Sequence, residues 1–177
     1  MACIAKGKAH KAYELGTKVA VVRGGKNTGV DSAIKRFSGN PHDSKTLEES
    51  LAQSERVRQQ IGDTRPQIAS ADRGFRGITQ VATTKIEIPR KAKEDSRYQQ
   101  EVARNRFRAT AAIEPAISHL KTNHALGLNF LKGVAGEVHN ALLSGIGYNL
   151  KLRFNKIKKQ VALWLEVSRT SPLKVSF

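Results

Sequence analysis

Residues 111–133 read AAIEPAISHLKTNHALGLNFLKG and hold one carboxylate, Glu114, in an otherwise apolar and basic run. The apolar residues recur at the spacing of one helical face: Ile113, Ile117 and Leu120. Lys121 follows Glu114 by seven residues, which is two turns of a helix. Two interpretations are open from these residues alone. The segment is either an ordinary surface helix whose first turn Pro115 marks, or a helix that presents a functional acid.

Toward the N-terminus, the sequence predicts a pair of antiparallel strands. The segment YELGTKVAVV at 13–22 becomes β-branched and apolar, as in a strand that is partly buried on both faces. The residues RGGKNT at 23–28 are typical of a hairpin turn, and a second strand is expected at 30–37.

A helix should follow the second strand, because Asn40 and Pro41 end the strand and Asp43 or Ser44 can cap a helix. The apolar stripe of this helix consists of Leu47, Leu51, Val57 and Ile61. Gly62 is a natural terminator.

An acid stands at the end of the next predicted strand. The segment QIASA at 67–71 leads directly to Asp72, and a glycine-containing turn follows at 73–77. In α/β folds functional groups are commonly exposed at such a place, although a turn-forming aspartate is an equally open interpretation. A short strand is predicted at 85–89 and a solvated, charged loop at 90–97.

The rest of the chain is predicted to be helical. One helix should run from about Tyr98 through the region of Glu114, bent by Pro115. Apolar residues again recur at helical spacing after Gly133, where the small residues Ala141 and Gly145 would allow close helix packing.

Charge indicates the kind of partner. The 177 residues are enough for one domain with its own core, and 39% of them are hydrophobic. Thirty-one Lys and Arg against fifteen Asp and Glu give a formal net charge of +16, which points to a polyanion such as nucleic acid. A basic protein of ribosomal type would carry a similar charge.

The single cysteine, Cys3, excludes an internal disulfide framework and a cysteine-rich zinc site. No stretch approaches the roughly 20 apolar residues of a membrane span, and the N-terminus lacks the apolar run of a signal peptide. We therefore expect a cytoplasmic protein without a membrane partner.

Four stretches, in order, carry a resemblance to a known family. They are CIAKGKAHKAYELGTKVAV at 3–21, SGNPHDSKTL at 38–47, ASADRGFRG at 69–77, and IEPAISHLKTNHALGLNFLKG at 113–133. Together they resemble the DDE transposases of bacterial insertion sequences, in which a glutamate is followed seven residues later by a lysine. Four ordered matches are more specific than any single motif.

The resemblance implies an α/β fold of the ribonuclease H-like type that lacks its first strand and is followed by C-terminal helices. Residues 1–12 would be an extended lead-in. Residues 13–132 would form an incomplete ribonuclease H-like catalytic core, and residues 133–177 a C-terminal helical segment packed on that core.

The resemblance also implies a site. Asp72 would be the second acid and Glu114 the third, and both would bind Mg²⁺ or Mn²⁺, whose preferred ligands are carboxylate oxygens. Lys121 would join them as a catalytic residue. The cations expected to contact DNA are Lys121, Arg73, Arg76 and Lys132.

The sequence departs from the family in several places. The first metal-binding aspartate is expected on a strand before Tyr13, and the chain has none there. Phe107 and Thr110 stand where the family has tyrosine and arginine, and Ala125 and Leu128 stand where it usually has arginine. Because these changes remove cations from the path of DNA, they indicate a decayed copy.

The expected function is therefore that of a DDE transposase, which cleaves and transfers DNA strands with divalent metal ions, in a truncated and inactive copy. The alternative is a non-catalytic, basic nucleic-acid-binding protein, so whether the chain is an enzyme stays open. The expected partners are DNA, as transposon ends and target, and a second copy or a missing N-terminal segment. We expect the protein at the bacterial nucleoid.

Overall fold

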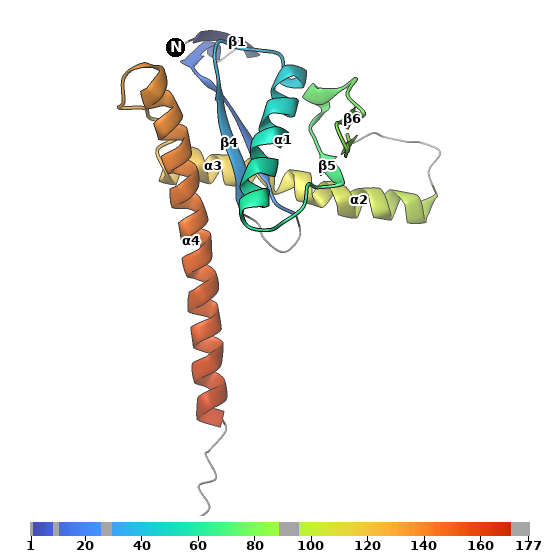
Figure 1. Ribbon diagram of the computed structural model, residues 1–177, viewed down its shortest axis with the longest axis vertical. Helices are drawn as coiled ribbons and strands as arrows, with labels where there is room; N and C mark the ends of the chain where they lie inside the picture. Colours follow the sequence, from blue (N-terminus) through green and yellow to red (C-terminus); the bar gives the residue numbers. More distant parts are fainter. Residues whose placement is uncertain (1, 9–10, 26–29, 89–95, 171–177) are drawn as a thin grey trace, which may run out of the picture.

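The computed structural model describes residues 2–8, 11–25, 30–88 and 96–170, which form a mixed α/β protein (Figure 1). Its elements in chain order are β1 (Ala2–Lys8), β2 (Lys11–Gly16), β3 (Lys18–Arg23), β4 (Asp31–Phe37), α1 (Asp43–Gln60), β5 (Ile68–Ser70), the 3-10 helix η1 (Arg73–Phe75), β6 (Gln80–Val81), β7 (Thr84–Glu87), α2 (Arg97–Ala111), α3 (Ile113–Asn123) and α4 (Gly133–Thr170). The described strands form three small sheets.

The first sheet lies where an extended lead-in is predicted. β1 pairs with β2 in antiparallel orientation, with Ala2 opposite Gly16 and Lys8 opposite Lys11. The predicted strand at 13–22 is thus divided between β2 and β3, with Thr17 between them.

The second sheet confirms the predicted antiparallel pair. β3 pairs with β4 from Lys18 opposite Phe37 to Arg23 opposite Asp31, and the register shifts once between Val22 and Arg23. The centre of the predicted turn, residues 26–29, lies outside the described residues.

The third sheet has the order β5–β7–β6, with β5 parallel to β7 and β6 antiparallel to it. It confirms the strands predicted at 67–71 and 85–89 to within a few residues. Most of the predicted charged loop after β7, residues 89–95, is outside the described part of the chain.

Helix α1 is where expected, but its cap and its stripe differ from the prediction. The N-cap is His42, whose Nδ1 accepts a hydrogen bond from the Ser44 amide, so neither Asp43 nor Ser44 caps the helix. Leu47 and Leu51 are buried. The rest of the predicted stripe is exposed, Val57 at 41% and Ile61 at 74%.

Small polar side chains replace the missing part of the apolar stripe. Ser50 and Ser54 of α1 are buried, and Ser54 shares a hydrogen bond of 2.8 Å with Ser32 of β4. Gly62 ends the helix as predicted, with a φ of 73° and its amide bonded to the carbonyl of Gln59. The small residues let α1 lie close to β4.

The predicted single helix bent at Pro115 is instead two helices, α2 and α3, which meet at Ala112. Proline has no amide hydrogen and crowds the carbonyl four residues before it, here that of Ala111. The break therefore falls three residues before the proline. Pro115 then sits in the first turn of α3, where an amide donor is not needed.

The long helix α4 packs on β4 and α3 through its first half. Gly145 permits this contact, as predicted, because a Cβ there would overlap Cδ1 of Ile34. Arg36 of β4 also forms an ion pair of 2.6 Å with Glu137 at the start of α4. Hydrogen bonds from Arg36 and Thr17 lower the pKa of Glu137.

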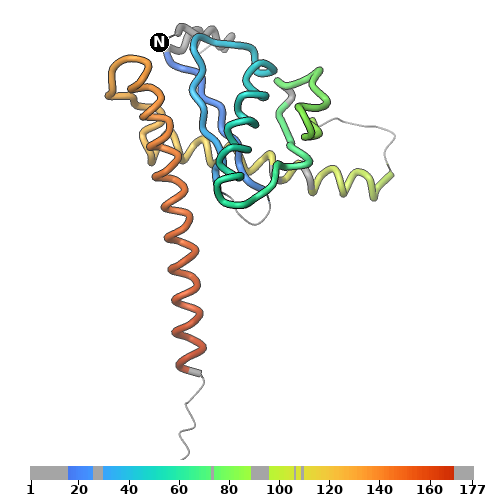
Figure 2. The backbone as a smooth tube through the Cα atoms, in the orientation of Figure 1, coloured from blue at the N-terminus to red at the C-terminus, as the bar shows by residue number. Residues whose placement is uncertain are grey.

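Two apolar clusters hold these elements together. The first joins β4, α3 and α4 through Ile34, Ala116, Leu120, Ala141 and Tyr148. The second joins α1, β5 and β7 through Leu47, Leu51, Ala71 and Ile86. From Arg153 to Arg169, by contrast, every side chain of α4 is exposed, and this outer half of the helix extends away from the rest of the chain (Figure 2).

Candidate functional site

Helix α3 carries two of the predicted site residues. Glu114 and Lys121 are both exposed, and seven residues of helix separate them by about 10 Å along the axis. Ala116 and Leu120 fix the helix from its other side, because they are 1% and 0% exposed in the first apolar cluster. The structure therefore holds the acid and the cation on a firmly packed element.

The helix dipole gives these two charges a purely structural role as well. Glu114 lies in the first turn of α3 and Lys121 in its last turn. A negative charge near the N-terminus and a positive charge near the C-terminus each stabilise a helix modestly. The positions alone therefore do not separate a functional pair from a stabilising one.

Asp72, the other predicted acid, lies two residues after the end of β5 and is exposed. Its position is well defined by its neighbour Ala71, which is buried and whose amide donates to the carbonyl of Glu87 at 2.9 Å. The carbonyl of Asp72 in turn accepts a hydrogen bond from the amide of Phe75, which closes η1.

The predicted DNA-binding cations fall in two places along the chain. Arg73 begins η1, and its side chain is outside the described part of the structure. Arg76 follows η1 and is exposed. Lys132 is exposed in the loop between α3 and α4, one residue before Gly133, whose φ is 75°.

The predicted acids do not fit a two-metal site. Within the described ranges, no group of three or more His, Cys, Asp or Glu side chains could hold a metal ion. Two bridged divalent ions need at least three carboxylates brought together. The structure therefore places Glu114 and Lys121 on one helix. Among the described residues, Asp72 is not part of a group of three or more metal-binding side chains.

Arg23, at the end of β3, is a functional candidate that the sequence did not single out. Its guanidinium donates to the carbonyl of Ala112 at 3.2 Å and to the hydroxyl of Tyr148 at 3.3 Å. These hydrogen bonds connect β3 to α4 and to Ala112, which lies two residues before Glu114.

Asp31 lies opposite Arg23 in the β3–β4 pair and is a buried acid. It is 6% exposed, and neither carboxylate oxygen has a hydrogen-bond partner among the described atoms. Burial raises its pKa to about 6, although the nearby Arg23 acts in the opposite direction. The side-chain amide of Asn149 bonds to the backbone of Asp31, accepting from its amide and donating to its carbonyl, each at 2.9 Å.

His119 of α3 and His124, which caps the C-terminus of that helix, pack around Tyr148. The ring of His119 stacks on it with centroids 6.4 Å apart, and the ring of His124 meets it edge-on at 5.7 Å. Burial, with help from Lys151 and His119, lowers the pKa of His124. Both rings thus pack against Tyr148 of the first apolar cluster.

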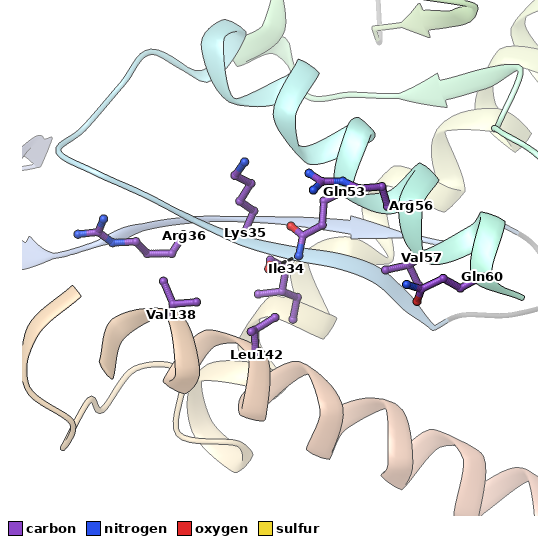
Figure 3. Close-up of a pocket in the computed structure, with 9 residues that line it drawn as sticks. All are labelled: Ile34, Lys35, Arg36, Gln53, Arg56, Val57, Gln60, Val138 and Leu142. Carbon is purple, nitrogen blue, oxygen red and sulfur yellow. Dashed lines mark hydrogen bonds between the residues drawn. The ribbon is translucent and has the colours of Figure 1, made fainter. Parts of the chain in front are cut away.

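A pocket of about 340 Å³ lies between β4, α1 and α4 (Figure 3). Its lining residues are Ile34, Lys35, Arg36, Gln53, Arg56, Val57, Gln60, Val138 and Leu142. Two of its three cations have acidic partners, since Lys35 pairs with Glu49 and Arg36 with Glu137. It contains none of the predicted site residues.

No helix among the described residues is long and apolar enough to cross a membrane. Comparisons of the chain with family models, with curated proteins and with solved structures found no match.

Proposed function

We propose that this chain is derived from a DDE transposase of a bacterial insertion sequence and acts on DNA. The observation that carries the proposal is the pair formed by Glu114 and Lys121, both exposed on the well-packed helix α3. Their spacing and the segment around them resemble the family signature. The other three matching segments cover β1 to β3, the start of α1, and β5 with η1.

We propose that the fold is a ribonuclease H-like one without its first strand. The succession of β3, β4, α1, β5 and the helices α2 to α4 supports this assignment. So does the open side of two strands: among the described residues, β3 pairs only with β4, and β5 only with β7. In the proposed fold, the missing central strand would pair with both.

In this proposal the chain's own residues bind and position DNA. Lys121 would contact a backbone phosphate as a point charge, and Arg76 and Lys132 would add further phosphate contacts. Such contacts fix the position of a duplex without reading its sequence. Mg²⁺ or Mn²⁺ would supply strand cleavage in a complete site, and among the described residues no group of three acids could hold such an ion.

The second candidate is a non-catalytic DNA-binding protein. A specific observation favours it: the net charge of +16 is retained, whereas no three-acid group is present among the described residues. DNA binding needs only the charge, and strand cleavage needs the acids. The two candidates therefore differ in chemistry and share a partner.

Nicking of supercoiled plasmid in the presence of Mn²⁺ separates the two candidates. We expect no nicking by the full chain and gel retardation of the same plasmid at low salt. Glu114→Ala is the test variant, and Glu101→Ala, which removes an exposed acid of α2, is its matched control. If the full chain nicks the plasmid, and Glu114→Ala abolishes the nicking while Glu101→Ala does not, the chain is an enzyme. If the full chain does not retard the plasmid at low salt, both candidates are refuted.

A further inference from the structure

Helix α4 carries an exposed apolar stripe along most of its length. The outer stripe, as defined here, consists of Leu143, Leu150, Phe154, Ile157, Val161 and Trp164. After the first step of seven residues, its members alternate between four and three residues apart. Each is between 44% and 67% exposed, so the described chain does not cover the stripe.

The outer stripe lies on the face of α4 that points away from the body of the protein. The face that packs carries Ala141, Ser144 and Tyr148, all buried. At 3.6 residues per turn, Leu150 and Val161 fall roughly opposite that face. By the same spacing, the stripe continues without a change of side from the packed half of α4 into its outer half.

The stripe has the geometry of a helix-pairing seam. In the outer half of α4 the stripe consists of Phe154, Ile157, Val161 and Trp164. These residues cover an arc of roughly 80° around the helix axis, which is narrower than the apolar face of a helix that lies in a membrane surface. Leu165 lies about 20° beyond one edge of that arc. Leu163 and Val167 lie well outside it, so the apolar residues of the outer half do not form one broad face. Alternating steps of three and four residues are those of a coiled coil, in which a second helix lies along the seam.

The charges beside the seam determine which helix fits. Lys151 and Lys158 flank it on one side and Arg153 on the other, whereas Glu166, the one acid of the outer half, lies on a different face. In a parallel pair with a second copy, Arg153 of one chain would meet Lys158 of the other. An antiparallel pair would also set flanking cations against cations. Self-pairing is thus disfavoured, and a seam with acidic flanks is favoured.

We propose that the outer stripe of α4 is a docking surface for an acidic amphipathic helix of another protein, held by coiled-coil packing. The apolar seam supplies the contact, and acidic flanks on the partner pair with Lys151, Arg153 and Lys158. This surface is separate from Glu114 and Lys121, so the inference stands whether or not the chain acts on DNA.

Trp164 is the only tryptophan of the chain and lies within the stripe, so its fluorescence reports occupation directly. The probe is a four-heptad peptide with leucine at the two seam positions and glutamate at the flanking positions. We expect saturable binding to the full chain, with a blue shift of Trp164 emission as its ring leaves water. A peptide with lysine at the flanking positions, and one with glutamate retained but serine in the seam, should both fail to bind.

The matched variants are Ile157→Gln in the stripe and Leu163→Gln on another face, both exposed apolar residues of the same helix. Because neither side chain is buried, neither change removes core packing. We expect Ile157→Gln to weaken peptide binding about tenfold or more and Leu163→Gln to leave it unchanged.

Four results would overturn the proposal. The first two are equal effects of the two variants on binding and no binding of the acidic peptide at all. The other two are binding of the peptide with glutamate flanks and serine in the seam, and self-association of the chain in sedimentation that Ile157→Gln abolishes. A blue shift of Trp164 on vesicles of anionic lipid that the acidic peptide does not compete away would assign the stripe to a membrane surface instead.

Discussion

At the scale of single residues, the buried acid Asp31 should make the stability of the protein depend on pH. Its folded-state pKa of about 6 exceeds the ordinary value of 3.8, so the folded protein binds more protons than the unfolded chain between these two pH values. Stability should therefore fall as the pH rises from about 4 to 6. At neutral pH the buried charge costs on the order of 3 kcal/mol.

Asp31→Asn should remove this cost, because the amide resembles the protonated carboxyl in shape and charge. We expect urea unfolding at pH 7 to show a more stable variant, with the difference disappearing near pH 4. Asp63→Asn is the control, since Asp63 is exposed and paired with Arg58, and an exposed pair is worth only about 0–1 kcal/mol. A wild type that gains stability from pH 4 to pH 6 would contradict the account of Asp31.

Metal binding is a second property decided by individual acids. Because no three-acid group occurs among the described residues, we expect calorimetry with Mn²⁺ to show at most one weak site. Asp72→Ala and Glu114→Ala test the two predicted ligands against Glu101→Ala. Two tight sites that both test variants abolish would mean that the acids assemble in a way the described structure does not contain.

At the scale of elements, the contact between α4 and β4 depends on Gly145. In Gly145→Ala the new methyl group would overlap Cδ1 of Ile34, which is buried. Overpacking costs about 1–3 kcal/mol, and the better helix propensity of alanine returns about 1 kcal/mol. We therefore expect a net loss of about 1 kcal/mol in the free energy of unfolding.

The double variant Gly145→Ala with Ile34→Val tests the mechanism, because valine lacks the overlapped Cδ1 atom. Ile34→Val alone should cost about 0.5–1.5 kcal/mol through the lost methyl group. In the Gly145→Ala background the same change should cost less or stabilise. Additive losses in the double variant would show that the two positions do not compete for space.

The same elements show what sequence patterns could and could not predict. The strand pair β3–β4, the start of α1 and the close packing at Gly145 follow from local patterns of apolar and small residues. The exposure of Val57 and Ile61 does not, because it depends on which other elements pack against α1. Likewise, Pro115 predicts a disturbance, but the position of the break at Ala112 follows from the geometry of the first turn.

Part of the candidate site could be predicted from the sequence, and part could not. The spacing of Glu114 and Lys121 places both on one helix, and the structure has them there. Arg23 and Asp31 carry no sequence signal, because they meet only through the register of the hairpin, which shifts just before Arg23. A buried acid beside a cation that ties three elements together arises from tertiary packing.

At the scale of the whole molecule, charge governs binding to DNA. With a net charge of +16, the chain should bind duplexes of any sequence, and its affinity should fall steeply as salt displaces it from the phosphates. We expect the double variant Lys121→Ala, Lys132→Ala to reduce the slope of log affinity against log salt by about one per lost phosphate contact.

Fluorescence anisotropy with two unrelated duplexes of equal length is the measurement. Equal salt slopes for both duplexes are expected. A strong preference for one sequence at physiological salt would show base readout and contradict a purely electrostatic interface.

The outer half of α4 has a consequence for how this protein opens and closes locally. Since all its side chains are exposed, tertiary packing does not support its helical state, which rests on the propensity of its own residues. Amide hydrogen exchange should therefore be fast toward Arg169 and slow near Tyr148. Within the outer half, trypsin should cut at Arg169 before it cuts at Lys156, Lys158 or Lys159. Any partner that binds the outer half of α4 must hold these residues in the helical state. Part of the binding free energy is therefore used to order the helix.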